Sequence, residues 1–195
     1  MKRLADILFS TMGLLFLLPF WMVIAALIPM TSRGGVFYRQ IRVGKGNKDF
    51  AMYKFRTMRQ GSDKSTLITI GDRDSRITRV GYYLRKYKLD ELPQLINVAL
   101  GDMSLVGPRP EVRKYVDQYS EEQLKVLSVR PGITDFASIQ YSKESELLGK
   151  AADPEWEYIN NILPAKLELN LKYIRDKGFV TDMKIILRTL VKIVQ

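Results

Sequence analysis

The chain contains no cysteine and no histidine among its 195 residues. The absence of cysteine excludes disulfides and thiolate nucleophiles, and the absence of histidine excludes a Ser-His relay. An ordinary zinc site is excluded as well, because its ligands are mainly these two residue types. Enzymatic chemistry in this chain would therefore depend on carboxylates, lysine, arginine, tyrosine or hydroxyl groups, with a hard cation such as Mg²⁺ that prefers oxygen ligands.

Negative charge is in short supply, since 31 lysines and arginines face 21 acidic residues and the net charge is +10. Such a balance favours partners that carry negative charge, namely nucleic acid, anionic lipid headgroups or phosphorylated small molecules. The length fits one domain with its own hydrophobic core. Charge alone does not choose among the three kinds of partner.

Residues 7–30 carry no charge and are almost entirely apolar. A run of about 20 apolar residues predicts a membrane-embedded helix, and the lack of a small-residue cleavage site disfavours a signal peptide. Pro19 removes a backbone donor in the middle of the run and predicts a bend. Basic residues flank both ends, which the positive-inside rule assigns to the cytoplasmic side. A re-entrant hairpin and a proline-kinked span both satisfy these observations.

Asp6 stands at the start of this apolar run. We expect its carboxylate either to pair with Lys2 or Arg3 on the same helix face, or to face the positive end of the helix dipole.

Residues 36–43 and 49–58 are typical of a short antiparallel pair of strands, joined by a turn at 44–47. Residues 60–76 are polar and predict a loop, and 79–87 predict a short helix. Further on we expect a helix over 111–127, a turn at 130–134, a loop at 142–154 and a helix from Pro164 to about residue 175. Residues 182–194 predict an amphipathic helix, either lying in a membrane interface or facing the core with a solvated basic edge.

Residues 89–110 contain the most informative motif, LDELPQLINVALGDMSLVGPRP. Asp90 and Glu91 are expected at the start of a helix, since Pro93 is tolerated only in a first turn, and Gly101 predicts its end. Adjacent carboxylates at such a position are usually favourable partners for the helix dipole. They also suit Mg²⁺ held between carboxylates and substrate phosphates, and a carboxylate is the best remaining candidate for a covalent nucleophile.

Arg109 lies between two prolines, which restrict its backbone. A rigidly presented guanidinium suits bidentate phosphate binding, although a turn with a surface salt bridge explains the tetrapeptide equally well. Lys54 and Arg56 alternate along the predicted second strand and are expected on one face. They either neutralise a second phosphate or keep an edge strand soluble.

Several blocks of residues, in this order, resemble the bacterial monotopic polyprenyl-phosphate phosphoglycosyl transferases, small membrane enzymes that begin glycan assembly. The resemblance covers residues 2 to about 134. The blocks are Lys2-Arg3 with Asp6, Phe37-Tyr38-Arg39-Gln40 with Arg42-Val43-Gly44, Lys54-Phe55-Arg56-Thr57-Met58, Leu89-Asp90-Glu91-Leu92-Pro93-Gln94-Leu95, Gly101-Asp102-Met103-Ser104, Val106-Gly107-Pro108-Arg109-Pro110 and Arg130-Pro131-Gly132-Ile133-Thr134.

The resemblance implies transfer of a sugar 1-phosphate from a UDP-sugar to undecaprenyl phosphate, with release of UMP and a requirement for Mg²⁺. It implies that Asp90 attacks the sugar-bearing phosphate to form a covalent intermediate, and that Glu91, beside it, holds the metal. Arg109 is then the expected phosphate ligand, with Lys54, Arg56 and Arg130 as helpers. The product would initiate a bacterial glycan: exopolysaccharide, O-antigen, capsule or glycoprotein glycan.

The expected fold is α+β and mainly helical, with a small antiparallel β element, a re-entrant membrane helix and amphipathic interfacial helices. Residues 1–31 are expected to form the re-entrant helix, bent near Pro19. Residues 32–195 are expected to form the catalytic domain on the cytoplasmic face of the inner membrane, with the amphipathic helix 182–194 at its end. Expected partners are the UDP-sugar, undecaprenyl phosphate and anionic lipids; a homodimer is compatible with the resemblance, which does not define the oligomeric state.

Two features depart from the family. Relatives often have Ser-Pro at the membrane break, where this chain has Leu18-Pro19, so the bend angle is not defined by resemblance. Many relatives continue Gly-Trp after Pro-Gly-Ile-Thr, whereas Asp135-Phe136 follows here, and the donor sugar cannot be inferred.

Two rival functions remain: a membrane-anchored nucleic-acid-binding protein and a noncatalytic subunit of a glycan assembly complex. Nucleic acid is not an expected partner, because that rival leaves the carboxylate pair and the apolar run unexplained.

Overall fold

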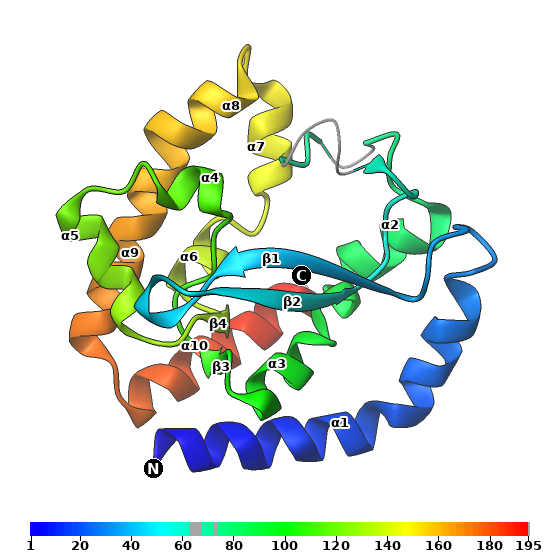
Figure 1. Cartoon of the computed structure of the whole chain (residues 1–195), viewed down its shortest axis with the longest axis horizontal. Coiled ribbons are helices and arrows are strands. Elements are labelled where there is room, and N and C mark those ends of the chain that lie inside the picture. Colours follow the sequence, from blue (N-terminus) through cyan, green and yellow to red (C-terminus); the bar gives the residue numbers. More distant parts are fainter. Residues whose placement is uncertain (63–67, 72–73, 195) are drawn as a thin grey trace.

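The computed structural model describes residues 1–62, 68–71 and 74–194 (Figure 1). Part of the predicted loop at 60–76 therefore lies outside the described residues. The strands are β1 (Phe37–Val43), β2 (Asp49–Phe55), β3 (Ser104–Val106) and β4 (Gly132–Thr134). The helices are α1 (Lys2–Leu27), α2 (Arg79–Lys86), α3 (Gln94–Leu100), α4 (Arg113–Val116), α5 (Glu121–Leu124), α6 (Phe136–Gln140), α7 (Glu144–Lys150), α8 (Pro154–Glu157), α9 (Leu163–Asp176) and α10 (Phe179–Val194).

The β1–β2 hairpin crosses the middle of the molecule in Figure 1. Its strands pair antiparallel, with Phe37 opposite Phe55, and a 3-10 turn over Lys45–Asn47 connects them. Gly46 and Asn47 in this turn adopt φ angles of 68° and 60°, a left-handed conformation that glycine and asparagine adopt most readily. The predicted antiparallel pair and its turn are confirmed, as is the short helix α2.

A second, parallel pair of strands was not predicted. Ser104 of β3 lies opposite Gly132 of β4, and Val106 lies opposite Thr134. The prediction of a simple turn at 130–134 is therefore wrong for its second half. The two backbones approach so closely that a Cβ atom on Gly132 would lie 2.0 Å from the backbone nitrogen of Gly107. Only glycine permits this approach, and the sequence of one segment does not reveal which distant backbone it will meet.

Helix α1 is continuous through Pro19. Figure 1 shows it running along the lower edge of the molecule and then turning upward. It is the one helix in the described part of the chain that is long and apolar enough to cross a membrane, by length and composition. Phe16 is 85% exposed, and most of the large apolar side chains of α1 are exposed with it. The helix contacts the domain along one side, where Gly13 packs close to Leu95 of α3.

The start of α1 docks on β3. The carboxylate of Asp6 is buried and accepts hydrogen bonds from Ser104 Oγ at 2.9 Å and from the backbone N–H of Leu105 at 3.1 Å. The predicted pairing of Asp6 with the basic residues before it is therefore wrong, and so is a simple dipole role. Lys2 instead forms an ion pair with Asp182 of α10. Tertiary packing supplies these partners, and the residues are distant in sequence.

One helix prediction and one loop prediction downstream are also wrong. The region 111–127 is divided into α4, α5 and a 3-10 turn over Lys125–Ser128. The division follows from Ser120, whose side chain caps a new helix in a reciprocal capping box with Gln123. The region 142–154, predicted as loop, contains α7, because Leu148 is 1% exposed and belongs to the main hydrophobic core.

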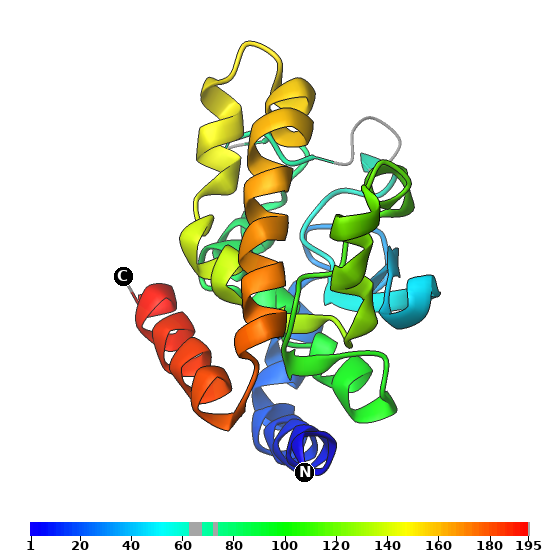
Figure 2. The same ribbon diagram turned by 90° about the vertical axis from the view of Figure 1, so that its left-hand side faces the viewer.

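Helix α9 passes through the centre of the molecule, and α10 flanks its lower end (Figure 2). Helix α9 contributes Leu163 and Leu167 to the main core and begins within one residue of the prediction. Helix α10 begins at Phe179, three residues before the predicted start. Its Ile185 is fully buried, while large apolar side chains on the same helix remain exposed, namely Phe179, Val180, Met183, Leu187, Leu190 and Val191. An orientation toward the core therefore accounts for only part of the apolar surface of α10.

Candidate active site

Asp90 and Glu91 lie in a 3-10 turn, Leu89–Glu91, directly before α3. We predicted that the helix itself would begin near Asp90, but α3 begins at Gln94 with Pro93 as its N-cap residue. The backbone N–H groups of Glu91, Leu92, Leu95 and Ile96 donate to carbonyls three residues back, at 3.0–3.3 Å. An α-helix through Asp90 would drive the ring of Pro93 into the carbonyl four residues earlier, and the tighter turn avoids that clash. Gly101 ends α3 in the left-handed conformation, as predicted.

Glu91 is the centre of an ion-pair network. Its two carboxylate oxygens accept a bidentate contact from the guanidinium of Arg109, with Nη1 to Oε2 at 2.9 Å. Lys54 Nζ lies 3.3 Å from Oε1 of the same carboxylate. Burial alone would raise the pKa of Glu91, but attraction to Arg109 and Lys54 outweighs it and holds this pKa well below the usual range. These two cations therefore favour the ionised form of Glu91.

Asp90 is in the opposite situation. It is 6% exposed, and among the described residues no basic side chain lies within ion-pair distance of its carboxylate. Burial and repulsion by the adjacent Glu91 raise the pKa of Asp90, and more distant cations offset this only in part. Two neighbouring carboxylates thus have unequal environments, which is a recurring feature of sites that divide two chemical roles between such groups.

Lys54 reaches this turn from β2, opposite Tyr38 in the hairpin. Burial, which the attraction of Glu91 offsets only in part, lowers the pKa of Lys54 to about 8. Arg109 is affected in the opposite direction: burial opposes its charge, but Glu91 and then Asp135 and Asp90 raise its pKa. The site holds two cations around two carboxylates, so an incoming phosphate would meet a cluster close to neutral.

The structure brings four of the six predicted site residues together: Asp90, Glu91, Lys54 and Arg109. The other two lie elsewhere. Arg56 donates to the backbone carbonyls of Gly35 and Phe37, at 2.8 and 3.3 Å, and Arg130 donates to the carbonyl of Gly101 at 2.8 Å. Arg56 directly follows β2, and its guanidinium lies 5.7 Å from the ring centroid of Tyr38, the residue opposite Lys54 in the hairpin.

Two residues that hold this geometry were missed. The side chain of Asn97 imitates a neighbouring strand along β2, accepting from the N–H of Tyr53 at 2.9 Å and donating to the carbonyl of Ala51 at 2.8 Å. Arg42 donates to the carbonyl of Pro110 at 3.1 Å and lies 3.4 Å from the carboxylate of Glu111. Both lie within motifs that the sequence singled out, but only the fold reveals their partners.

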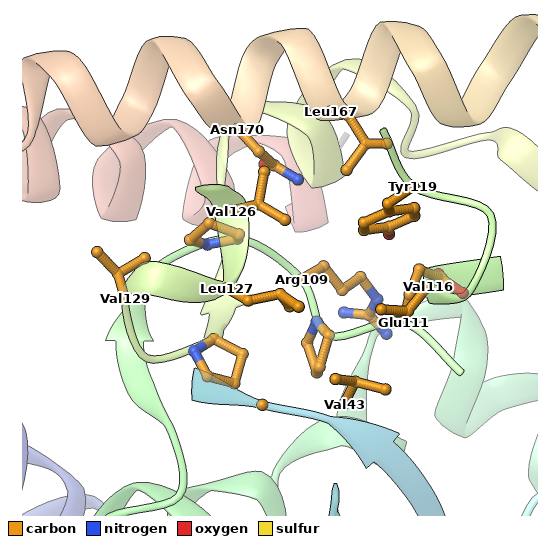
Figure 3. A pocket seen from close by; sticks show the side chains of 14 residues that line it. Val43, Arg109, Glu111, Val116, Tyr119, Val126, Leu127, Val129, Leu167 and Asn170 are labelled. Atoms are coloured by element: carbon orange, nitrogen blue, oxygen red, sulfur yellow. The ribbon is translucent and has the colours of Figure 1, made fainter. Parts of the chain in front are cut away.

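A cavity of about 20 Å³ lies behind Arg109, where α9 faces the end of β1 (Figure 3). Asn170 and Leu167 reach into it from α9, and Val43 lies on the opposite side. Oδ1 of Asn170 is buried there without a hydrogen-bond partner among the described residues. This volume suits a water molecule and is far too small for a nucleotide sugar. A substrate would therefore approach Arg109 from the side of Glu91.

Asp90 and Glu91 are chemically suited to hold Mg²⁺ together with substrate oxygens. Mg²⁺ commonly binds one or two carboxylates, water and substrate phosphate, and Asp90 offers a carboxylate that forms no ion pair within the described ranges of the chain. Glu91 would have to share its oxygens with Arg109. The part of the chain that the structure describes has no cluster of three or more acidic side chains that could hold an ion alone. The two carboxylates therefore fit a metal ion whose coordination is completed by oxygens of the substrate.

Comparisons with known proteins give a consistent result. The family model described as bacterial sugar transferase matches residues 1–195. A UDP-N-acetylgalactosamine-undecaprenyl-phosphate N-acetylgalactosaminephosphotransferase of Aeromonas hydrophila is 40% identical over 97% of this chain and 42% of its own length. A UDP-glucose:undecaprenyl-phosphate glucose-1-phosphate transferase of Escherichia coli (strain K12) is 35% identical over 98% of this chain and 40% of its own length.

The exopolysaccharide production protein PSS of Rhizobium leguminosarum bv. phaseoli is 36% identical, over 98% of this chain and 94% of its own length. The chain spans about two fifths of the length of the first two relatives, and nearly all of the third.

Proposed function

The chain belongs to the bacterial sugar transferase family, and from that premise we propose that it transfers a sugar 1-phosphate from a UDP-sugar to undecaprenyl phosphate. The relatives from Aeromonas hydrophila and Escherichia coli are named for such transfers. The observation that carries the proposal is the contrast between two adjacent carboxylates: Glu91 is paired with Arg109 and Lys54, whereas Asp90 is buried and has no ion pair with any residue that the structure describes.

The reaction proceeds in two displacements. An oxygen of ionised Asp90 forms a bond to the phosphorus that carries the sugar, and the bond from that phosphorus to the bridging oxygen breaks, so that UMP leaves. A phosphate oxygen of undecaprenyl phosphate then attacks the same phosphorus, and the acyl-phosphate bond to Asp90 breaks. The product is undecaprenyl diphosphate sugar, and the Asp90 carboxylate is regenerated.

The cations of the site have distinct tasks in this scheme. Arg109 binds a phosphate of the donor bidentately, and Lys54 offsets the negative charge that gathers around the phosphorus. Arg56 and Arg130 remain in the proposal as cations that assist Arg109 by attracting more distant phosphate oxygens. Glu91 and Asp90 would hold Mg²⁺, which when bound neutralises phosphate charge and orients the donor.

The acceptor lipid requires a membrane, and α1 supplies an apolar surface for it. Its side chains are largely exposed and its start is fixed to β3, so α1 would enter the bilayer while the site stays close to the surface. We propose a re-entrant helix bent at Pro19, with the domain on the cytoplasmic face of the inner membrane. The exposed apolar side chains of α10, beside Lys184, Arg188 and Lys192, suit the interface of a bilayer with anionic lipids.

A screen of UMP release tests the activity. Purified full-length chain is incubated with undecaprenyl phosphate, Mg²⁺ and a panel of UDP-sugars, and UMP is measured. We expect release with at least one donor. The absence of release with every donor would contradict the proposal and favour a noncatalytic subunit of a glycan assembly complex. The donor that reacts would also indicate which exopolysaccharide, O-antigen, capsule or glycoprotein glycan the product can begin.

The topology of α1 has its own test, which the absence of cysteine simplifies. Leu4→Cys and Gly35→Cys place single thiols near the two ends of the apolar segment, at exposed positions. A re-entrant helix predicts that an impermeant thiol reagent labels both from the cytoplasmic side. Labelling of the two positions from opposite sides would show a spanning helix instead.

A further inference from the structure

Asp135 is fully buried and is the first residue after β4. Its two carboxylate oxygens have separate partners. Oδ1 accepts the backbone N–H of Ser138 at 2.6 Å, which caps helix α6. Oδ2 accepts the backbone N–H of Arg109 at 3.1 Å. The second contact connects Asp135 to the arginine that pairs with Glu91, although 26 positions separate the two residues.

The parallel pairing of β3 and β4 places Asp135 at this point. Val106 lies opposite Thr134, and the N–H of Gly107 donates to the carbonyl of Thr134 at 3.1 Å. The chain turns directly after this pairing, because the carbonyl of Pro108 accepts the N–H of Gly132 at 2.9 Å and so lies beside β4. This turn, together with the pairing of β3 and β4, brings the backbone N–H of Arg109 within hydrogen-bond distance of Asp135.

Arg109 offers the one backbone donor of its tripeptide, since Pro108 and Pro110 have no N–H. A buried donor of this kind needs an acceptor, and Asp135 supplies a charged one. On the other side of the tripeptide, Arg42 donates to the carbonyl of Pro110. The backbone of Arg109 is thus held at both ends, while its guanidinium remains directed toward Glu91.

We propose that Asp135 is a positioning residue that holds the Arg109 backbone so that its guanidinium meets a phosphate of the nucleotide sugar. The inference rests on the proposed function, because it needs Arg109 to bind donor phosphate. It assigns to Asp135 a role that goes beyond capping α6.

The substitution Asp135→Ser separates positioning from helix capping. Serine caps a helix about as well as aspartate, but its single oxygen cannot also accept from Arg109. We expect the KM for the reacting UDP-sugar to rise about tenfold, the effect of losing one charge-assisted hydrogen bond, while kcat changes less than twofold. Asp135→Asn, also a good cap with one acceptor oxygen, provides a second variant of nearly native size and is expected to raise KM similarly.

Asp153→Ala serves as the matched control, because Asp153 caps α8 through the N–H groups of Glu155 and Trp156, away from the site. This variant should lower the melting temperature and leave KM unchanged. In the background of Arg109→Ala, which itself raises KM, Asp135→Ser should add less than a twofold change, since the residue acts through Arg109.

The outcomes separate the two hypotheses. If wild type releases UMP and Arg109→Ala raises KM, but both Asp135 variants keep the wild-type KM, the positioning role is wrong and the proposed function stands. A tenfold effect of Asp135→Ser that persists in the Arg109→Ala background also overturns the role, because it shows action independent of Arg109. If wild type releases no UMP with any donor, the proposed function fails and the positioning role fails with it.

Discussion

Asp90 is a buried carboxylate and Glu111 a mostly buried one, with 12% of its side chain exposed, and their surroundings differ in how the charge is satisfied. Glu111 accepts a hydrogen bond from the hydroxyl of Tyr158 at 2.8 Å and one from the N–H of Val112 at 3.1 Å, with Arg42 at 3.4 Å. Burial raises its pKa, but Arg42 and other partners outweigh burial and lower it. Asp90 has no ion pair among the described residues, and its pKa is raised.

The difference indicates what each carboxylate does for the protein. A buried charge with a full set of partners stabilises the fold as long as every partner remains. A buried charge without them lowers stability and stays available to a substrate or a metal. The comparison predicts that substitutions near Asp90 change turnover, whereas substitutions near Glu111 change the free energy of unfolding.

The largest effect on turnover is expected from Asp90→Asn. The amide cannot form the acyl-phosphate bond, so UMP release should fall about a thousandfold or more. Incubation with labelled UDP-sugar in the absence of lipid should leave label on wild type and none on the variant. Because a buried like charge is removed beside Glu91, thermal denaturation should show unchanged or higher stability. Equal label on both proteins would contradict the covalent step.

Glu91→Gln should have the next largest effect. It removes the charge that Arg109 and Lys54 share and the proposed metal ligand, so activity should fall about 10- to 100-fold and the Mg²⁺ concentration for half-maximal activity should rise. The measurement is a Mg²⁺ titration of UMP release. Glu144→Gln is the control, because Glu144 pairs with Lys166 in a comparable way outside the site. An unchanged titration would argue against a metal-ligand role for Glu91.

A smaller, pH-dependent effect is expected from Lys54. Its pKa in the folded protein, about 8, lies below the ordinary lysine value of 10.5, so its positive charge is lost as the pH rises through about 8. Wild-type turnover should fall there, and Lys54→Arg, which stays charged, should keep its turnover at higher pH. Lys114→Arg is the control, since Lys114 forms an exposed ion pair with Glu155. A pH profile unchanged by Lys54→Arg would exclude this role.

The same displacement of the Lys54 pKa has a consequence for stability. Between pH 8 and 10.5 the unfolded chain binds more protons than the folded chain, so the Lys54 contribution to the free energy of unfolding rises with pH over that window. Denaturant titrations of wild type and Lys54→Arg at the two ends of the window would measure this difference.

The smallest effect on turnover is expected from Glu111→Gln. Arg42 would lose its charged partner, and the free energy of unfolding should fall by about 2–4 kcal/mol. Turnover per folded molecule should change less than threefold, because Glu111 does not contact the Asp90–Glu91 turn. A urea titration together with UMP release tests this. A large loss of turnover at unchanged stability would remove the distinction between the two carboxylate sites.

Local patterns predicted several elements correctly. Alternating residues around a glycine-containing turn predicted the β1–β2 hairpin. Residues 79–87 predicted the short helix α2, and Gly101 predicted the end of α3. The errors at 111–127, 130–134 and 142–154 have different causes. The first has a local cause, because Ser120 and Gln123 form a capping box that begins a new helix. The other two depend on distant partners, Gly107 for Gly132 and the main hydrophobic core for Leu148, and a short sequence window does not contain that information.

The sequence by itself determined the available chemistry, because a chain without cysteine and histidine leaves carboxylates, lysine and arginine for work on phosphates. It also determined the apolar helix, which depends only on length and composition. Tertiary structure alone decided which cations meet Glu91, why Asp90 forms no ion pair in the part of the chain that the structure describes, and how Asp135 reaches Arg109. These contacts close long loops, and whether such a loop closes depends on packing throughout the fold.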